Sequence, residues 1–151
     1  MNKIHKTAVV SSGAIIGSNV TIGPFSIIGD NVRIANDNII HSSVIISGNT
    51  DIDENNQFFP FCSIGSIPQD LKYRGENSKL LIGRNNTFRE YCNANLGTEG
   101  DNMETIIGND SLFMVGVHIA HDCIIENEVI FAMVEMASIS TIASKIMRNL
   151  L

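Results

Sequence analysis

Two histidines, an aspartate and a cysteine lie close together in the stretch "MVGVHIAHDCIIENEVI", residues 114 to 130. His118 and His121 are three residues apart, and Asp122 and Cys123 follow directly. Imidazole titrates near neutral pH, so this group could supply a general base for proton transfer. It could equally form part of a metal site, or the histidines could be ordinary side chains without a chemical role. The choice depends on where each side chain points, and therefore on the backbone period.

The sequence repeats with a period of six residues. From Ile4 to Ile64 every sixth residue is apolar, often with Gly directly after it. Asn or Asp, which suit a corner, often stands three places after the apolar residue, at Asn19, Asn31, Asp37, Asn49 and Asn55. Neither a helix nor a single strand gives this period, whereas hexapeptide repeats of a parallel β-helix do. The sequence therefore predicts an all-β solenoid over residues 1–137, with three hexapeptides in each triangular coil.

Two segments interrupt the repeat. Within residues 66–81 the period would place Asp70 and Glu76 in the core, where an unpaired carboxylate carries a large desolvation penalty. We therefore expect this segment to leave the coil as a loop excursion. A second break at 97–105 shifts the repeat by one residue. Residues 138–151 show helical spacing and predict a short helix that covers the open end, although a divergent frameshifted tail would look similar.

The period assigns a direction to each candidate residue. With Ile119 inward, His118 points outward, and His121 and Asp122 occupy the corner that follows. The same argument points all three cysteines inward, as packing residues without a redox role, at Cys62, Cys92 and Cys123. His5 and His41 belong to distant coils, so the three or four ligands of a metal site are missing and we expect no metal.

Outward positions also sort into faces of the solenoid. Val9, Ile27, Ile45 and Ser63 share one face, and this mostly apolar stripe predicts a subunit interface. The alternative is a set of scattered surface isoleucines.

Composition limits the classes of partner and the location. The 151 residues carry a formal net charge of −6, which argues against nucleic acid as a partner. No apolar run approaches the ~18 residues of a membrane span, and "MNKIHKT" is no secretory signal. We therefore expect a cytoplasmic protein without membrane insertion.

Several motifs in fixed order resemble a known family. They are "NVTIGPFSIIG", "QDLKYRGE" at 69–76, "IGRNNTFRE" at 82–90, "GT" at 97–98 and "HIAHDC" at 118–123. Together, over about residues 4–132, they resemble the acyl-carrier-protein:UDP-N-acetylglucosamine O-acyltransferases of lipid A biosynthesis. The excursion motif followed by "HIAHDC" is the most specific part.

The resemblance implies a left-handed β-helix, a homotrimer and an active site between adjacent subunits. It implies transfer of a 3-hydroxyacyl chain from acyl carrier protein to the 3-hydroxyl of UDP-N-acetylglucosamine. His121 would be the general base, and Asp122 would orient it. Asp70 and Lys72, with Gln69 in the same motif, would hold the sugar nucleotide, and His118 would line the same cleft. No cofactor is implied, because the thioester donor is already activated.

This chain also departs from the family. It reads "ANLGT" where the family has "TIHRGT", and the family's Gly-His pair falls on Ile139 and Ser140. Later coils and a C-terminal helical domain have no counterpart, so the resemblance implies a shortened form. The alternatives are a non-catalytic trimeric solenoid remnant, a zinc hydratase-like hexapeptide protein, and an N-acyltransferase acting on an amino sugar.

Overall fold

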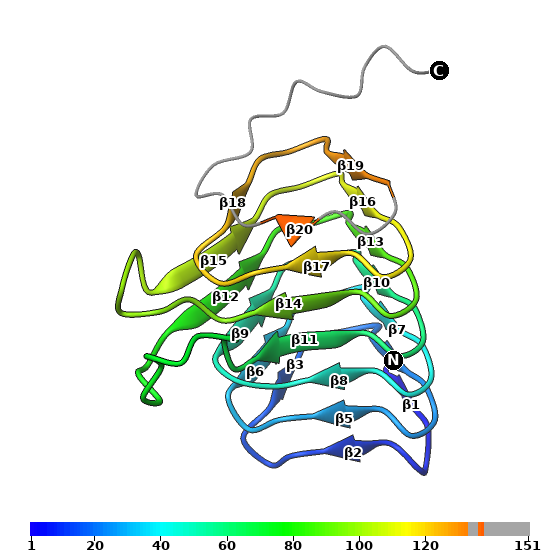
Figure 1. Ribbon diagram of the computed structural model, residues 1–151. Coiled ribbons are helices and arrows are strands. Elements are labelled where there is room, and N and C mark those ends of the chain that lie inside the picture. Colours follow the sequence, from blue (N-terminus) through cyan, green and yellow to red (C-terminus); the bar gives the residue numbers. More distant parts are fainter. Residues whose placement is uncertain (133–135, 138–151) are drawn as a thin grey trace.

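Short strands follow one another around a three-sided coil, and each pairs in parallel with the strands one coil away (Figure 1). This computed structural model describes residues 1–132 and the backbone of residues 136–137. Strand partners are 18 residues apart in the lower coils, as Val9↔Ile27 and Ile27↔Ile45 show. The hexapeptide period therefore produces the predicted all-β left-handed parallel β-helix. The predicted C-terminal helix, with the tail at 138–151, lies outside the described residues.

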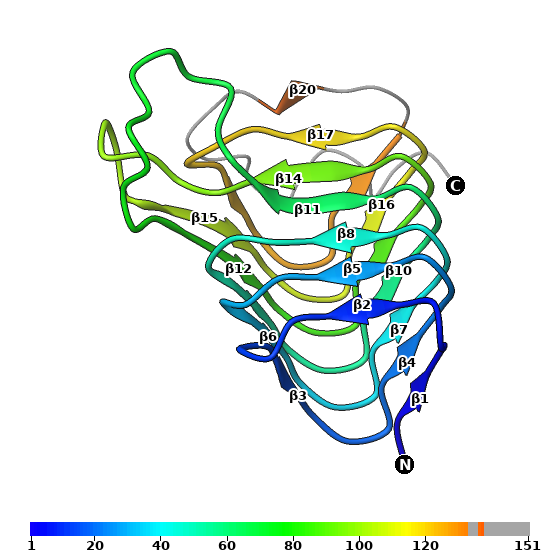
Figure 2. The same cartoon turned by 90° about the horizontal axis from the view of Figure 1, so that it is seen from below.

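Three parallel sheets form the sides of the prism (Figure 2). The first contains β1 (Lys3–Ile4), β4 (Thr21–Ile22), β7 (Ile39–Ile40), β10 (Gln57–Phe58), β13 (Thr87–Phe88), β16 (Leu112–Phe113) and β19 (Ile130–Phe131). The second contains β2 (Val9–Val10), β5 (Ile27–Ile28), β8 (Ile45–Ile46), β11 (Ser63–Ser66), β14 (Asn93–Asn95), β17 (His118–Ile119) and β20 (Met136–Ala137). The third contains β3 (Ile15–Ile16), β6 (Val32–Ile34), β9 (Thr50–Ile52), β12 (Lys79–Ile82), β15 (Glu104–Ile107) and β18 (Ile124–Ile125).

The core is a set of stacked apolar columns. Every sixth residue from Ile22 to Ile64 points inward and is buried, as the period predicts. The first sheet adds a column of aromatic rings, Phe58, Phe88, Phe113 and Phe131, which stack at centroid distances of 4.9, 4.6 and 5.6 Å. The three cysteines are buried, as predicted. A hydrogen bond with Cys92, together with burial, raises the pKa of Cys62, which suits a packing role.

A buried asparagine ladder joins successive coils. Asn38 and Asn56 are fully buried, and Asn86 nearly so. The backbone N–H of Asn56 donates to Asn38 Oδ1, and that of Asn86 donates to Asn56 Oδ1, each at 2.9 Å. The ladder continues from Asn86 Oδ1 to the backbone N–H of Ser111. These side chains accept hydrogen bonds from backbone N–H groups that have no partner in a strand. They therefore stabilise the corner between the third and first sheets.

The corners of the coil use left-handed backbone angles. Asn19, Asp37 and Asn55 have φ between 58° and 61°, as expected for turn formers. Asn31 and Asn49 do not, and at one of these corners Gly48 takes the positive φ instead. Between the first and second sheets, the residues with positive φ include the exposed aromatics Phe25, Phe61 and Tyr91, which the period did not predict.

Both interruptions are loops that leave the prism at the same corner, between the second and third sheets (Figure 2). The first is shorter than the predicted 66–81, because Ser66 still belongs to β11 and β12 already begins at Lys79. It starts at a bulge where Gly65 has φ +74°. The second loop, residues 96–103 between β14 and β15, overlaps the predicted 97–105 break, but residues 104 and 105 already belong to β15. Partners across the loops are 30 and 25 residues apart, rather than 18.

In the part of the chain that the structure describes, no helix is long and apolar enough to cross a membrane.

Candidate active site

His121 lies on the corner between β17 and β18, at the foot of both loops. Ile119 points into the core and is buried, so the chain turns outward after it and places the imidazole on the surface of the prism. The side chain of His121 is 34% exposed, which leaves the ring partly sheltered but open to a substrate. The structure thus places His121 at an outward corner, as the period predicted.

Asp122 forms the turn and also supports the imidazole. Its φ of 61° makes the corner, and its carboxylate is buried and turns back under the ring. His121 Nδ1 and Asp122 Oδ2 are 2.8 Å apart. The period predicted the corner, and the family resemblance implied a contact with His121. The two roles occur together in one residue.

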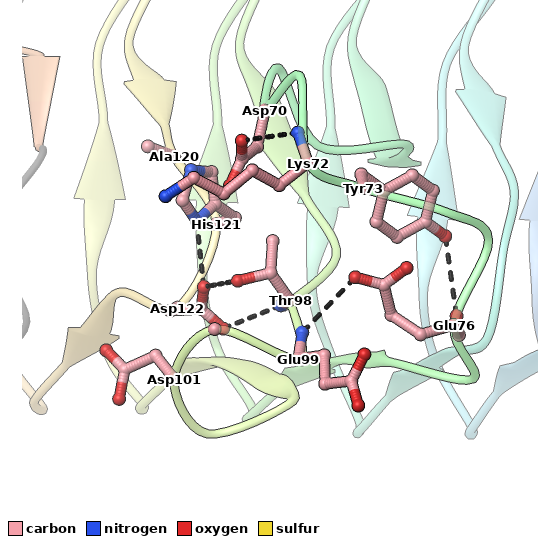
Figure 3. Close-up of a pocket in the computed structure, with 11 residues that line it drawn as sticks. Asp70, Lys72, Tyr73, Glu76, Thr98, Glu99, Asp101, Ala120, His121 and Asp122 are labelled. Atoms are coloured by element: carbon pink, nitrogen blue, oxygen red, sulfur yellow. Dashed lines mark hydrogen bonds and ion pairs between the residues drawn. The ribbon is translucent and has the colours of Figure 1, made fainter.

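The loop at 97–103 holds Asp122 in this position (Figure 3). The backbone N–H of Thr98 donates to Asp122 Oδ1 at 2.7 Å, and the Thr98 hydroxyl donates to Oδ2 at 2.5 Å. From the other side, the backbone N–H of Asp122 donates to Thr105 Oγ1 at 2.9 Å. The carboxylate is therefore satisfied although it is buried.

The two loops and the His121 corner enclose an open cleft of about 800 Å³. Lys72 lies in the first loop, and its side chain extends toward His121 (Figure 3). Asp70 accepts a hydrogen bond from the backbone N–H of Lys72 at 2.8 Å, which shapes the turn that carries both residues. Most of the other polar side chains are acidic, and the cleft is lined by Asp70, Lys72, Tyr73, Glu76, Thr98, Glu99, Gly100, Asp101, Ala120, His121 and Asp122.

Glu76 ties the first loop to the second. Its carboxylate accepts from the backbone N–H of Arg74 at 2.7 Å and from that of Glu99 at 3.3 Å. Hydrogen bonds from its own backbone N–H and from Arg74 hold the pKa of Glu76 below its ordinary value of 4.5. The loops therefore meet through a charged hydrogen-bond acceptor.

Two predicted residues lie outside the lining of the cleft. Gln69 is exposed on the first loop, before Asp70. His118 lies on the outward face of β17, where its Nδ1 is hydrogen-bonded to Asn93 Oδ1 on β14. Desolvation by burial lowers the pKa of His118, and the charge of His121 lowers it further. His118 is thus biased toward its neutral form beside the base candidate, rather than inside the cleft.

The sequence reading missed Thr98, Glu76 and the acidic residues of the second loop as site residues. Their signal was present, because both breaks in the repeat fall at the same corner as His121. The sequence analysis did not work out that both loops leave the prism at this corner. In the described residues, no group of three or more His, Cys, Asp or Glu side chains is arranged to hold a metal ion.

Comparison with known proteins agrees with the hexapeptide-repeat fold. Residues 13–48 match the family model "bacterial transferase hexapeptide (six repeats)". The chain is 53% identical over 122 residues to the acyl-[acyl-carrier-protein]–UDP-N-acetylglucosamine O-acyltransferase of Rickettsia canadensis, covering 81% of this chain and 46% of that protein. The chain is a homologue of these O-acyltransferases.

The O-acyltransferase of Thermodesulfovibrio yellowstonii is 45% identical over 146 residues, or 97% of this chain and 55% of that protein. This match extends past residue 132, where the motif resemblance was expected to end. The solved O-acyltransferase structure LpxA from Acinetobacter baumannii is 49% identical with a TM-score of 0.84, covering 85% of this chain and 50% of that one. The chain thus spans about half the length of the O-acyltransferases that it matches.

Proposed function

We propose that this chain acts as an O-acyltransferase on UDP-N-acetylglucosamine, with His121 as the general base. The observation that carries the proposal is the His121–Asp122 pair, 2.8 Å apart, at the foot of a cleft built by two loops. The names of the homologous proteins supply the substrates, the acyl carrier protein as donor and the sugar nucleotide as acceptor.

In this mechanism Asp122 occupies Nδ1 of His121 and leaves Nε2 available to the acceptor. Nε2 removes the proton of the sugar 3-hydroxyl while that oxygen attacks the carbonyl carbon of the 3-hydroxyacyl thioester. The tetrahedral intermediate then collapses, the C–S bond breaks, and the imidazolium returns its proton to the departing thiolate. The ester and the free thiol of acyl carrier protein are the products, and no cofactor takes part. Ile139, which stands where the family has the glycine of its Gly-His pair, lies outside the described residues.

Two groups in the mostly acidic cleft suit parts of a sugar nucleotide. Lys72 is the one cation among the lining residues, so it is the candidate for the diphosphate. Carboxylates such as Asp70 are acceptors that suit sugar hydroxyls. Gln69 and His118 lie at the margin, where they would contact substrate only if a neighbouring subunit extends the cleft.

A homotrimer is part of the proposal. The outward stripe of the second sheet is exposed, with Val9 57%, Ile27 44% and Ile45 43% accessible. His118 lies on the same sheet, several coils further along. A closed assembly that packs this sheet against a neighbour would cover the apolar stripe and extend the cleft.

The test measures ester formation by the purified chain, given 3-hydroxyacyl-acyl carrier protein and UDP-N-acetylglucosamine. His121→Ala should lower kcat by about 100-fold or more, because a positioned base contributes 10²–10⁴-fold. His5→Ala is the matched control, since His5 is exposed in the first coil and bonds Thr7. Full activity of His121→Ala would overturn the assignment.

Other products of the same assay address the alternatives. An amide product would indicate an N-acyltransferase. Stoichiometric zinc in the purified chain would indicate a zinc hydratase-like hexapeptide protein. A folded trimer that forms no ester would identify a non-catalytic solenoid. A cytoplasmic location stays a prediction, which cell fractionation would test.

A further inference from the structure

The second loop carries a group that the proposed mechanism does not use directly. Thr98 is 4% exposed, and both of its donors are directed at Asp122. Because its backbone N–H and its hydroxyl both bind one carboxylate, Thr98 restrains Asp122 as well as connecting two strands. We infer that Thr98 is a positioning residue, which orients Asp122 and thereby fixes the imidazole of His121 with its proton on Nδ1. This inference rests on the proposed role of His121 as the base.

The hydrogen-bond directions lead to the tautomer. Asp122 Oδ2 accepts from the Thr98 hydroxyl at 2.5 Å and lies 2.8 Å from His121 Nδ1. An ionised carboxylate can only accept, so the proton between Asp122 and His121 belongs to Nδ1. Nε2 then carries the lone pair that a general base needs. Without the Thr98 contacts the carboxylate could rotate about its side-chain torsion, and the imidazole would lose this restraint.

The loop itself is anchored so that Thr98 can reach Asp122. The backbone N–H of Met103 donates to the Thr98 carbonyl at 3.0 Å, and that of Gly97 donates to the Lys79 carbonyl at 3.1 Å. A Cβ at Gly97 would lie 2.2 Å from the backbone nitrogen of Glu104. Only glycine fits there, so Gly97 allows the two ends of the loop to close and bring Thr98 over the carboxylate.

Thr98→Val removes the hydroxyl and keeps the volume of the side chain. We expect kcat to fall about 10-fold with little change in KM for UDP-N-acetylglucosamine, because the base is misoriented while the sugar contacts persist. Thr98→Ser keeps the hydroxyl and should restore kcat to near the wild-type value. Thr50→Val is the matched control, since Thr50 is fully buried and donates to the Ser47 carbonyl, away from the cleft.

The deciding readout is the ¹⁵N spectrum of the His121 ring, which reports the tautomer without any turnover. Wild-type protein and Thr98→Ser should show the Nδ1–H form, and Thr98→Val a mixture of the two tautomers. Gly97→Ala, which displaces Thr98 but leaves its hydroxyl intact, should show the same mixture. If Thr98→Val does not fold, the smaller Thr98→Ala takes its place.

The outcomes separate this inference from the proposed function. A Thr98→Val spectrum identical to that of wild type, or a wild-type ring protonated on Nε2, would overturn the positioning role even if the chain transfers acyl groups. A tautomer that depends on Thr98 in a chain that makes no ester would uphold the positioning role and overturn the acyltransferase assignment. Loss of kcat in Thr50→Val equal to that in Thr98→Val would also overturn the inference, because general destabilisation would then explain both.

Discussion

At the scale of single residues, the site depends on a few side chains that serve two purposes. Asp122 forms a left-handed corner with φ 61° and also supports His121. Asp110 occupies the equivalent turn position with φ 58°, and its carboxylate accepts from Asn85 of the neighbouring corner. The same corner geometry thus places the carboxylate of Asp110 on an asparagine and that of Asp122 on the imidazole of His121.

Glu76 gives a pH dependence at this scale. Its pKa is lowered in the folded state by hydrogen bonds from its own N–H, from Arg74 and from Glu99. A lowered carboxyl pKa means that the contribution to stability is complete above the unfolded pKa and is lost as pH falls through the folded pKa. We therefore expect the contact between the two loops to persist at pH 4.5 and to be lost at lower pH.

The measurement is an NMR titration of the Arg74 and Glu99 amide resonances. Both should shift with one midpoint below 4.5, the ordinary value of the carboxyl. In Glu76→Gln the shared titration should vanish, because no proton is then taken up at this side chain. A midpoint at or above 4.5 in the wild type would contradict the assignment of Glu76 as the tie between the loops.

At the scale of elements, the strands are only two to four residues long, so the contacts between coils stabilise them. The buried ladder of Asn38, Asn56 and Asn86 is one such contact. Asn56 Oδ1 accepts from the Asn86 backbone N–H, and its amide donates to the Asp53 carbonyl at 2.8 Å. Asn38 and Asn56 therefore satisfy backbone groups of their own corner and of the next.

Asn56→Ala leaves the Asn86 N–H buried and without an acceptor. The free energy of unfolding should fall by about 1–3 kcal/mol, the usual penalty for a buried unsatisfied group. Urea unfolding at a fixed protein concentration measures this loss of unfolding free energy. Gln57→Ala, on the outward face of the next position, should change stability by no more than about 0.5 kcal/mol. Equal effects of the two changes would show that the ladder adds no stability.

At the scale of the whole molecule, one side of the solenoid carries an exposed apolar stripe. Val9, Ile27 and Ile45 are in register on adjacent strands of the second sheet, so they form a continuous apolar stripe. On the third sheet the corresponding column is interrupted by charge, because Arg33 and Asp51 form an ion pair with a 3.7 Å separation. This asymmetry between the sides of the prism favours association through the second sheet.

Ile27→Asp places a carboxylate in the middle of the stripe. If the stripe is a subunit interface, burying that charge carries a penalty of several kcal/mol, so the trimer should dissociate at micromolar concentration. Sedimentation velocity measures the change, and ester formation should fall with it. Ile15→Asp is the control, an exposed isoleucine on the third sheet whose change should leave the trimer intact. A monomeric wild-type chain would contradict the proposed assembly.

The sequence alone determined which way many side chains point and where the chain must leave the coil. The six-residue period places Ile22 to Ile64 and the three cysteines inward, and His121 on an outward corner, because a strand's side chains alternate between its two faces. The carboxylates of Asp70 and Glu76 require an excursion, since an uncompensated charge cannot stay in the core. These are local rules, and they hold coil by coil.

Only the tertiary structure decided which residues meet. Residues 70, 98 and 121 lie on three different coils, and the lengths of two loops determine that they share one cleft. The period turns Asn38, Asn56 and Asn86 inward, but only the stacked coils decide which backbone groups their amides meet. Such contacts form between coils 18 to 30 residues apart, and the period alone gives neither the path of a loop between two coils nor the hydrogen-bond partner of a side chain.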